Sequence, residues 1–226
     1  MFFFFNYNMF SIFNSLVIKL DWFHNFNCIL LLCIVYFVLF LFLMFFLLNF
    51  NFKLNLSFYN LELLGCFLPM LILLMQMLPS LIFLYNLHYM GYENDLSVKI
   101  IGHQWYWTYE LGDNLGMEFD SYMKSNDYLI LGDYRLLEVD NRLIIPKDML
   151  IRFVMTSTDV IHSWALPMYF IKLDVMSGMM SVFNYSFNII GLFYGQCSEI
   201  CGTNHSFMPV VVEVTLFNFF KNYMFL

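Results

Sequence analysis

The sequence predicts a membrane-anchored β protein, in which a transmembrane hairpin of two helices precedes an all-β domain. Its 226 residues are 61% hydrophobic, above the roughly 45–50% of ordinary soluble domains. The long uncharged apolar runs are confined to the first ninety residues. After them the chain changes to short runs rich in Val, Ile, Tyr, Phe and Trp, which turn-prone segments separate.

Residues 28–48 form the first predicted membrane helix. This run holds no charged residue and no strong helix breaker, and a helix of its length rises about 31 Å, close to the roughly 30 Å of a hydrocarbon core. Residues 63–87 form the second predicted membrane helix, with kinks expected at Pro69 and Pro79. Membrane helices tolerate proline better than soluble helices do. Two buried helices of a soluble core are the alternative, but the first run has no polar face.

The rest of the chain is predicted to form short strands. Several such runs, with turn-prone stretches between them, favour an all-β sandwich or barrel. The predicted strands are 98–111, 135–140, 142–146, 150–157, 191–196 and 209–217. We therefore expect two domains, an N-terminal segment with the helical hairpin over 1–90 and the β domain over 91–226.

The charge of the chain is concentrated in the predicted β domain. Residues 91–226 hold fifteen of the seventeen acidic and eight of the ten basic residues, so the whole net charge of −7 lies there. An acidic domain argues against a nucleic-acid partner and favours a cationic one. The N-terminus has no basic region before a short apolar core, so no secretory signal or transit peptide is expected.

The segment GQCSEICGTNHSFMP, residues 195–209, points most directly to a function. Cys197, Glu199, Cys201, His205 and Met208 lie there within twelve positions. A disulfide between the two cysteines would leave the histidine and the methionine without a role. Structural zinc sites usually have a second pair of ligands well downstream, and a thioether is not a usual zinc ligand. A chance arrangement in a loop is the third alternative.

Copper suits this set of donors better. A blue-copper site takes one Cys, two His and a weak axial Met, and His162 in STDVIHSW could supply an imidazole from upstream. One copper needs only one cysteine, so two thiolates, two imidazoles and a thioether suit two coppers that share both sulfurs. The backbone carbonyl of Glu199 is available as a further weak ligand. Since the protein ligands leave no open position, the site is expected to pass electrons rather than bind a substrate.

Four more blocks accompany the cysteine loop, and together they carry a family resemblance. They are GHQWYWTYE (102–110), FDSYM (119–123), LLEVDNRLIIP (136–146) and DVIHSWALP (159–167). In this order they resemble the cytochrome c oxidase subunit II family, over about residues 20–217. The resemblance implies a cupredoxin-like Greek-key β domain after the helical hairpin. It places the hairpin in the mitochondrial inner membrane and the β domain in the intermembrane space.

The resemblance also implies a function. The chain would accept electrons from cytochrome c at a binuclear copper A centre and pass them to haem a in the catalytic subunit. That partner subunit would hold the haems and reduce dioxygen to water, with proton pumping. By match, His162, Cys197, Cys201 and Met208 would ligate one copper. Cys197, the Glu199 carbonyl, Cys201 and His205 would ligate the other, and the Glu199 side chain would bind Mg²⁺, for which a carboxylate is a suitable hard ligand.

Trp105 is implied to be the point where the electron enters, although aromatic residues on a strand are usually core. Trp107 and Tyr106 stay ambiguous between the two roles. Alternation along one strand would put Trp105 and Trp107 on the same face, with His103, and Tyr106 on the other. A lone imidazole such as His103 is expected to be structural.

Four carboxylates are also candidates by match. Glu110, Asp120 and Asp140 fall in the matching blocks and are implied to dock the lysine-rich face of cytochrome c, although acidic side chains on a surface usually serve solvation. Glu62 opens the second helix, where the helix dipole favours a carboxylate. The resemblance places it near the entrance of a proton pathway.

One block departs from the family pattern, and two rival functions remain. Segment 172–181 keeps three family residues and replaces three others, so contacts around the haem propionates are expected to differ. The kept residues are Lys172, Asp174 and Gly178, and the replacements are Ser177 for Pro, Met179 for Arg and Ser181 for Asn. A quinol-oxidising relative would have lost the copper ligands. A membrane-tethered copper carrier or chaperone would not need Trp105, the acidic residues or Glu62.

Overall fold

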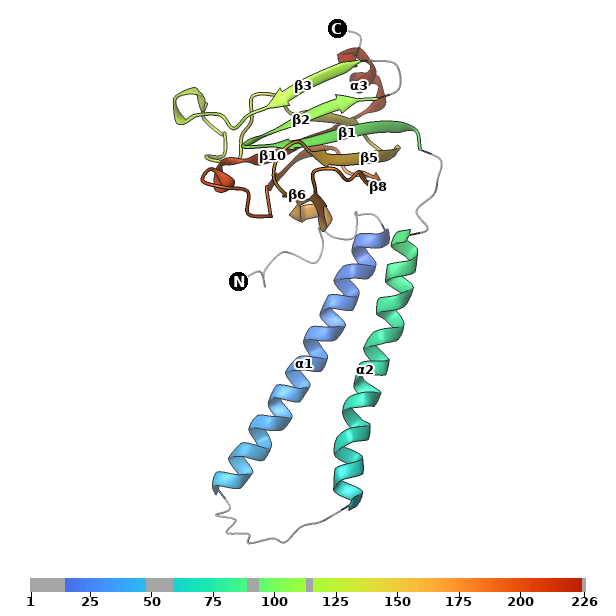
Figure 1. Cartoon of the computed structure of the whole chain (residues 1–226). Helices are drawn as coiled ribbons and strands as arrows, with labels where there is room; N and C mark the ends of the chain where they lie inside the picture. The colour runs from blue at the N-terminus through green and yellow to red at the C-terminus, as the bar shows by residue number, and fades with distance from the viewer. Residues whose placement is uncertain (1–14, 48–58, 89–93, 113–115, 225–226) are drawn as a thin grey trace. The chain divides into compact units, whose positions relative to one another are not determined.

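The computed structural model describes residues 15–47, 59–88, 94–112 and 116–224 (Figure 1). These residues form two compact units, one that holds the two long helices from Ile18 onward and one that holds the strands. The domain boundary predicted at 90/91 lies outside the described residues and stays a prediction.

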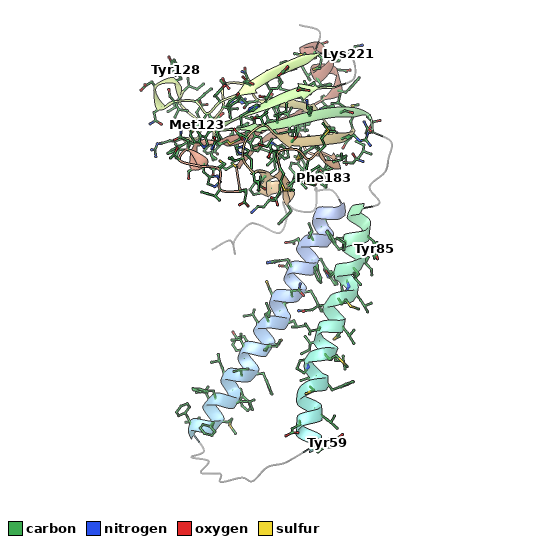
Figure 2. The ribbon with its side chains drawn as sticks, in the orientation of Figure 1. Tyr59, Tyr85, Met123, Tyr128, Phe183 and Lys221 are labelled. Carbon is green, nitrogen blue, oxygen red and sulfur yellow. The ribbon has the colours of Figure 1, made fainter. Side chains whose placement is uncertain are left out.

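The helical unit consists of α1 (Ser15–Leu47) and α2 (Tyr59–His88), both longer than predicted. Within them, Ile18–Leu47 and Glu62–Tyr85 are long and apolar enough to cross a membrane, with mean hydropathies of 3.2 and 2.2. Side chains project outward along the whole length of both helices (Figure 2), and nearly all of those in the apolar windows are exposed. A soluble core would bury them, so the exposed apolar surface supports two lipid-facing spans.

The β unit contains one sheet of five strands, in the order β3-β2-β1-β5-β8. Its strands are β1 (Leu96–His103), β2 (Tyr106–Leu111), β3 (Met117–Ser121), β5 (Leu150–Ser157) and β8 (Ser181–Ser186). Strands β1 and β5 are parallel, whereas the other neighbours are antiparallel. Because residues 96–103 and 150–157 alternate strictly between buried and half-buried positions, this sheet has one inner face.

The remaining strands form two smaller sheets. β4 (Leu143–Pro146), β10 (Pro209–Thr215) and β9 (Gly191–Gln196) pair in the order β4-β10-β9, and β6 (His162–Leu166) pairs with β7 (Ile171–Val175). The short 3-10 helices are η2 (Asn126–Tyr128), η3 (Pro167–Tyr169) and η4 (His205–Phe207), and α3 (Phe217–Met224) follows β10.

A single core joins these sheets. From the large sheet it takes side chains such as Ile100 and Phe153, and from the smaller sheets Val212, Leu143 and Trp164, all of them with no exposed surface. The side chains of facing sheets thus fill one interior, as in a β-sandwich. This core fixes the strands whose ends carry the cysteine loop.

Some strand predictions are wrong in detail. The run 98–111 is a hairpin rather than one strand, with Gln104 and Trp105 as its two turn residues. No glycine, proline or asparagine occupies the two turn positions, so no residue type there indicated a turn. Strands β3, β6, β7 and β8 and helix α3 were not predicted. β6 is buried at every position, so it shows no alternation that could have revealed it.

Residues 135–140 were predicted to be a strand but form turns. Leu136 has a φ of 67°, which a strand does not allow. The segment is instead held by its buried carboxylate, Glu138, which accepts hydrogen bonds from the Tyr194 hydroxyl (2.7 Å) and from Arg142 (3.3 Å). These side-chain bonds add to one short backbone pairing, the isolated bridge between Val139 and Met123.

Candidate metal centre

The cysteine loop connects β9 to β10 and is fastened at two points. The Cys197 N–H donates to the Met208 carbonyl (3.0 Å), which closes the base of the loop. The Ser198 N–H donates to the Ser163 carbonyl (2.9 Å), which attaches the loop to β6. Since His162 begins β6, this second bond brings the upstream histidine next to the cysteines.

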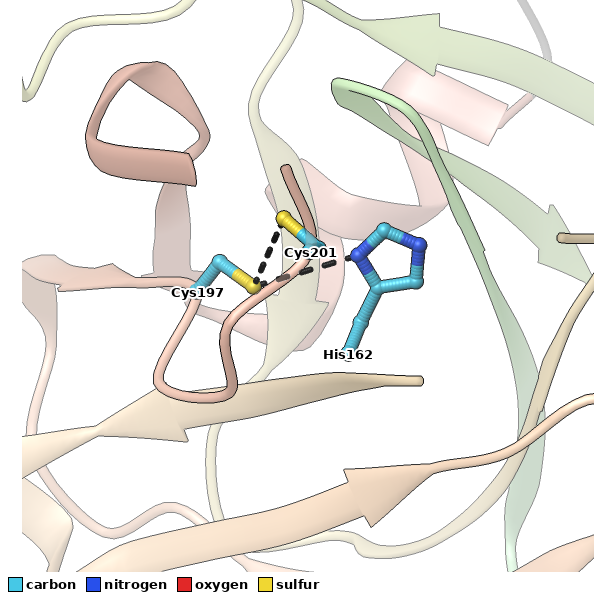
Figure 3. A group of neighbouring side chains, drawn as sticks. All are labelled: His162, Cys197 and Cys201. Carbon is cyan, nitrogen blue, oxygen red and sulfur yellow. Dashed lines mark hydrogen bonds between the residues drawn. The ribbon is translucent and has the colours of Figure 1, made fainter. Parts of the chain in front are cut away.

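Three donor atoms meet in a buried group. His162, Cys197 and Cys201 each offer one ligand atom, and these atoms lie within 4.8 Å of one another. Figure 3 shows the Cys197 sulfur between the other two, 3.9 Å from the Cys201 sulfur and 3.9 Å from the His162 Nδ1. All three side chains are buried. The structure therefore contains a possible His/Cys/Cys metal-binding group.

The other predicted ligands lie around this group. The His205 Nδ1 is 3.5 Å from the Cys201 sulfur, so each sulfur has one imidazole nitrogen beside it. The Glu199 carbonyl lies 3.4 Å from the Cys197 sulfur. Met208 is buried and belongs to the same hydrophobic core as both cysteines. The loop and the start of β6 thus bring together two thiols, two imidazoles and a carbonyl.

A disulfide does not use these thiols in the structure. Both cysteines are free, and their sulfurs are 3.9 Å apart, about twice the length of a sulfur–sulfur bond. A disulfide between the two cysteines would also leave neither sulfur free to bind a metal as a thiolate. Soft thiolate and thioether donors, together with imidazole, are a set that fits copper.

Asp159 orients the upstream histidine, and sequence analysis did not single it out. Its Oδ1 lies 2.8 Å from the His162 Nε2, so the ring turns its Nδ1 toward the thiols. The Ser157 hydroxyl and the Val160 N–H bond to the same carboxylate. Burial lowers the pKa of His162, but its contacts with Cys197 and Asp159 outweigh burial and raise the pKa above its usual value. A carboxylate behind a ligating histidine is a common support for a metal site.

The two thiols have very different acidities. Burial raises the pKa of Cys197, but the His162 ring and nearby backbone groups outweigh burial and lower it to about 6. For Cys201, burial and then the neighbouring Cys197 raise the pKa to about 12. Without metal, the pair therefore holds one thiolate at neutral pH, and this thiolate is the reactive, metal-ready form of cysteine.

This asymmetry predicts the titration of the metal-free protein. As pH rises through about 6, one thiolate per chain should form, and the second thiol should stay protonated far into the alkaline range. Thiolate ultraviolet absorbance measures both steps. His162→Ala should move the first step toward the ordinary cysteine value of about 8.5. His103→Ala should not, because the His103 ring contacts Thr158 and Tyr106 rather than a thiol. Two thiolates that form together would contradict the asymmetry.

Trp105 lies in the β1–β2 turn, and that turn touches the cysteine loop. The Gln104 side-chain amide donates to the Cys201 carbonyl (2.7 Å), and the Gln104 N–H donates to the Asp159 Oδ2 (2.7 Å). A Cβ on Gly202 would come within 3.1 Å of the Trp105 ring. The indole thus packs against the loop backbone, one residue beyond Cys201. Like Asp159, Gln104 was not singled out by sequence analysis, because nothing in the motif revealed its bonds.

The other aromatic residues of this block take distinct places. Trp107 is completely buried and meets His162 edge-on, with ring centroids 5.9 Å apart, so it is a core residue. His103, Tyr106 and Tyr122 form a stack with centroid spacings of 4.5 and 4.4 Å. His103 is also 2.8 Å from the Thr158 hydroxyl. Since His103 and Tyr106 are paired across the hairpin, they share a face, unlike in the predicted single strand.

A shallow surface hollow of about 460 Å³ lies beside the turn. Gln104, Trp105 and Tyr106 line it from the turn, Tyr122 and Met123 from the segment after β3, and Asn204 and Phe207 from the cysteine loop. Its lining is mainly aromatic and apolar, and it borders both the tryptophan and the loop.

Two of the predicted docking carboxylates lie near this hollow. Asp140 accepts a hydrogen bond from the Tyr122 N–H (2.8 Å), and Asp120 accepts one from the Thr108 hydroxyl (2.7 Å). Both are exposed. Glu110 differs, because it is engaged in an ion pair with Lys99 at 2.8 Å. Glu62 belongs to the helical unit, where it is exposed in the first turn of α2.

The divergent segment joins β7 to β8. Ser177 forms an isolated bridge with Ser157, Gly178 has a φ of 75°, and Met179 is 56% exposed. The thioether that the resemblance predicts in place of an arginine therefore lies on the surface.

Comparison with known proteins identifies the family. Residues 96–215 match the family described as cytochrome c oxidase subunit II, periplasmic domain. A cytochrome c oxidase subunit 2 from Ascaris suum is 56% identical over 94% of this chain and 91% of its own length. The chain belongs to the cytochrome c oxidase subunit II family. The corresponding protein of Caenorhabditis elegans is 54% identical over 99% of this chain and 97% of its own length.

Two solved structures support the fold. The periplasmic domain of subunit II (CoxB) of Bradyrhizobium japonicum has a TM-score of 0.54 and 40% identity, covering 58% of this chain and 92% of that one. A mixed disulfide intermediate between the thioredoxin-like protein TlpAs and subunit II of cytochrome c oxidase has a TM-score of 0.51 and 38% identity, covering 59% and 91%. These comparisons confirm the predicted cupredoxin-like domain and the assignment to a cytochrome c oxidase subunit.

Proposed function

We propose that this chain is the electron-entry subunit of its oxidase, with a binuclear copper centre in the cysteine loop. The observation that carries the proposal is the pairing of each cysteine sulfur with one imidazole Nδ1, at 3.9 and 3.5 Å. Two such thiol–imidazole pairs within one buried loop suit two coppers better than one. The family is also a copper-binding one, and the His/Cys/Cys group is present here.

Each donor has a proposed role. His162 and Met208 would hold one copper, His205 and the Glu199 carbonyl would hold the other, and both cysteines would serve as ligands to the pair. When bound, the coppers would supply the one-electron redox chemistry needed between cytochrome c and haem a of the catalytic subunit. The loop bonds of Cys197 and Ser198 keep the donors at fixed positions, so little rearrangement accompanies a change of charge.

Electron entry is proposed at Trp105. Its ring packs against Gly202, the residue after Cys201, and borders an apolar hollow on the surface. A partner whose cofactor edge reached this hollow would stand next to an aromatic ring that touches the donor loop. The position therefore suits a ring that couples a partner on the surface to the buried centre.

Cytochrome c is the proposed partner, and opposite charges on the two proteins would attract it to the β domain. The net negative charge of residues 91–226 would attract the lysine-rich face of cytochrome c over a distance. Asp120, Asp140 and Glu110 would lie opposite that face. Asp120 and Asp140 are supported by their exposure. Glu110 already has Lys99 as a partner, so its contribution to docking should be the smallest of the three.

The remaining roles rest on the family match. The Glu199 carboxylate is proposed to bind Mg²⁺ shared with the catalytic subunit, and its half-buried position on the loop suits a bound carboxylate. Glu62, in the first turn of α2, is proposed to stand at the entrance of a proton pathway. The two spans would lie in the mitochondrial inner membrane, with the β domain in the intermembrane space.

Copper content tests the central proposal. The expressed domain 91–226 should bind two coppers per chain, since a solved relative consists of this domain alone. Cys197→Ser should remove a shared sulfur and with it the binuclear electron paramagnetic resonance spectrum. Met208→Leu should keep both coppers and shift the reduction potential, because an axial thioether tunes rather than holds the metal.

Met180→Leu is the matched control for the thioether, because Met180 is 70% exposed and should change neither quantity. One copper per chain with a mononuclear spectrum would refute the binuclear centre. Copper binding without co-purifying haem in the intact membrane preparation would favour a copper carrier over an oxidase subunit.

A further inference from the structure

Within the part of the chain that the structure describes, the hydrogen bond between the turn that carries Trp105 and the donor loop comes from the Gln104 side chain. Its amide nitrogen lies 2.7 Å from the Cys201 carbonyl oxygen, a bond between positions 97 residues apart in the chain. Sequence-distant segments that meet through one short hydrogen bond depend on it for their spacing. No backbone pairing fixes these two segments, because the β1–β2 ladder ends at His103 and Tyr106.

The indole itself contributes no hydrogen bond to this contact. Its Nε1 is buried and has no hydrogen-bond partner in the part of the chain that the structure describes. The ring is therefore held against the loop by packing, at a glycine whose φ of 128° and missing side chain leave room for it. A Cβ at Gly202 would stand 3.1 Å from the Gln104 Nε2 and 3.1 Å from the ring, so the amide and the indole share this space.

The backbone of Gln104 adds a second connection. Its N–H donates to the Asp159 Oδ2 at 2.7 Å, and the Oδ1 of the same carboxylate contacts the His162 Nε2 at 2.8 Å. One residue of the turn thus reaches both sides of the candidate centre, the Cys201 side through its amide and the His162 side through Asp159. This arrangement holds the turn in a defined position relative to both.

We propose that Gln104 is a positioning residue for electron entry, whose side-chain amide keeps the Trp105 ring in contact with the backbone of the donor loop. The inference rests on the proposed function, since it takes Trp105 as the entry point. Electron transfer depends on the spacing between the ring and the centre, so a small displacement of the turn should slow it. Gln104 does not need to touch the partner or the metal for this role.

The test compares Gln104→Met with Asn218→Leu in the intact oxidase. Methionine has a length close to that of glutamine but no donor, so the bond to Cys201 is lost with little change in size. Asn218 is the control, because it is an exposed amide on α3 that does not line the hollow. Copper content and spectrum should be unchanged in both variants, since the Cys201 carbonyl is not a proposed ligand.

Two quantities should separate the variants. Flash-initiated electron transfer within the cytochrome c complex should slow on the order of tenfold in Gln104→Met, because misplaced groups lose rate steeply, while the Kd stays unchanged. In the metal-free full chain with Trp22→Phe, acrylamide should quench tryptophan fluorescence more strongly in Gln104→Met. Trp107 and Trp164 have no exposed surface, so this readout reports Trp105. Asn218→Leu should leave both quantities unchanged.

The outcomes are distinguishable. If Gln104→Met weakens binding but leaves the transfer rate and the quenching unchanged, Gln104 is a docking contact and the inference is wrong. It is equally wrong if neither binding nor rate changes while Trp105→Ala is slow. If Trp105→Ala itself transfers electrons at the normal rate, the entry role in the proposed function fails, and the positioning role fails with it.

Discussion

Trp105→Ala is expected to slow electron transfer from bound cytochrome c by about 100-fold, the scale of a misplaced reacting group, without changing the Kd. The substitution removes no charge, so the electrostatic attraction between the two proteins is unaltered. It removes the one ring that both borders the surface hollow and packs on Gly202. The electron would then have to cross a gap that the indole had filled.

Stopped-flow reduction by ferrous cytochrome c across a salt series measures this effect. The comparison is the triple variant Glu110→Gln, Asp120→Asn and Asp140→Asn, which should lower the association rate at low salt. That deficit should shrink toward about 0.15 M salt, where the Debye length is about 8 Å. Tyr128→Ala is the aromatic control, since Tyr128 is 78% exposed and does not line the hollow.

The result would contradict the entry role in one clear case. If Trp105→Ala weakened binding in parallel with the carboxylate variant, while transfer within the complex stayed fast, the indole would be a packing residue of the docking face.

The sequence allowed the donor set to be predicted because its chemistry is local. Five of the six ligand candidates lie in one loop, and soft donors at such spacing limit the choice of metal before any fold is known. Only the structure shows that Cys197 and Met208 are neighbours, because the Cys197 N–H donates to the Met208 carbonyl and closes the loop. The strands with regular alternation, β1 and β5, were also predictable.

The support around the donors could not be predicted, because it depends on contacts between distant segments. Asp159 orients His162 and receives the N–H of Gln104, 55 residues away in the chain. No typical turn residue occupies the hairpin turn at Gln104 and Trp105. Sequence alternation therefore predicted Trp105 to lie within a strand, whereas it lies in the turn. Strand β6 lacked alternation because both of its faces are covered.

Gly195→Ala is expected to lower the free energy of unfolding of the β domain by about 3 kcal/mol, the upper range for overpacking a core, and to abolish assembly of the metal centre. Gly195 lies on β9, two residues before Cys197 and opposite β6. An added Cβ would overlap the backbone oxygen of Ala165 and come within 2.9 Å of its carbonyl carbon. Backbone atoms cannot rotate away, so β9 and β6 would have to separate.

Separation of β9 from β6 would displace the donor residues His162 and Cys197, because these residues lie at the ends of the two strands. β6 begins with His162, β9 leads into Cys197, and the Ser198–Ser163 bond of 2.9 Å joins their ends. Urea unfolding and copper content of the domain measure the two effects. Gly132→Ala is the control, because a Cβ there meets nothing within 4 Å and only the backbone strain of its φ of 107° remains, at about 1–3 kcal/mol. Adding Ala165→Gly to Gly195→Ala should not restore stability or copper, since the overlap is with backbone atoms. A double variant that regained both would show that side-chain crowding, rather than the approach of the two strands, makes glycine necessary here.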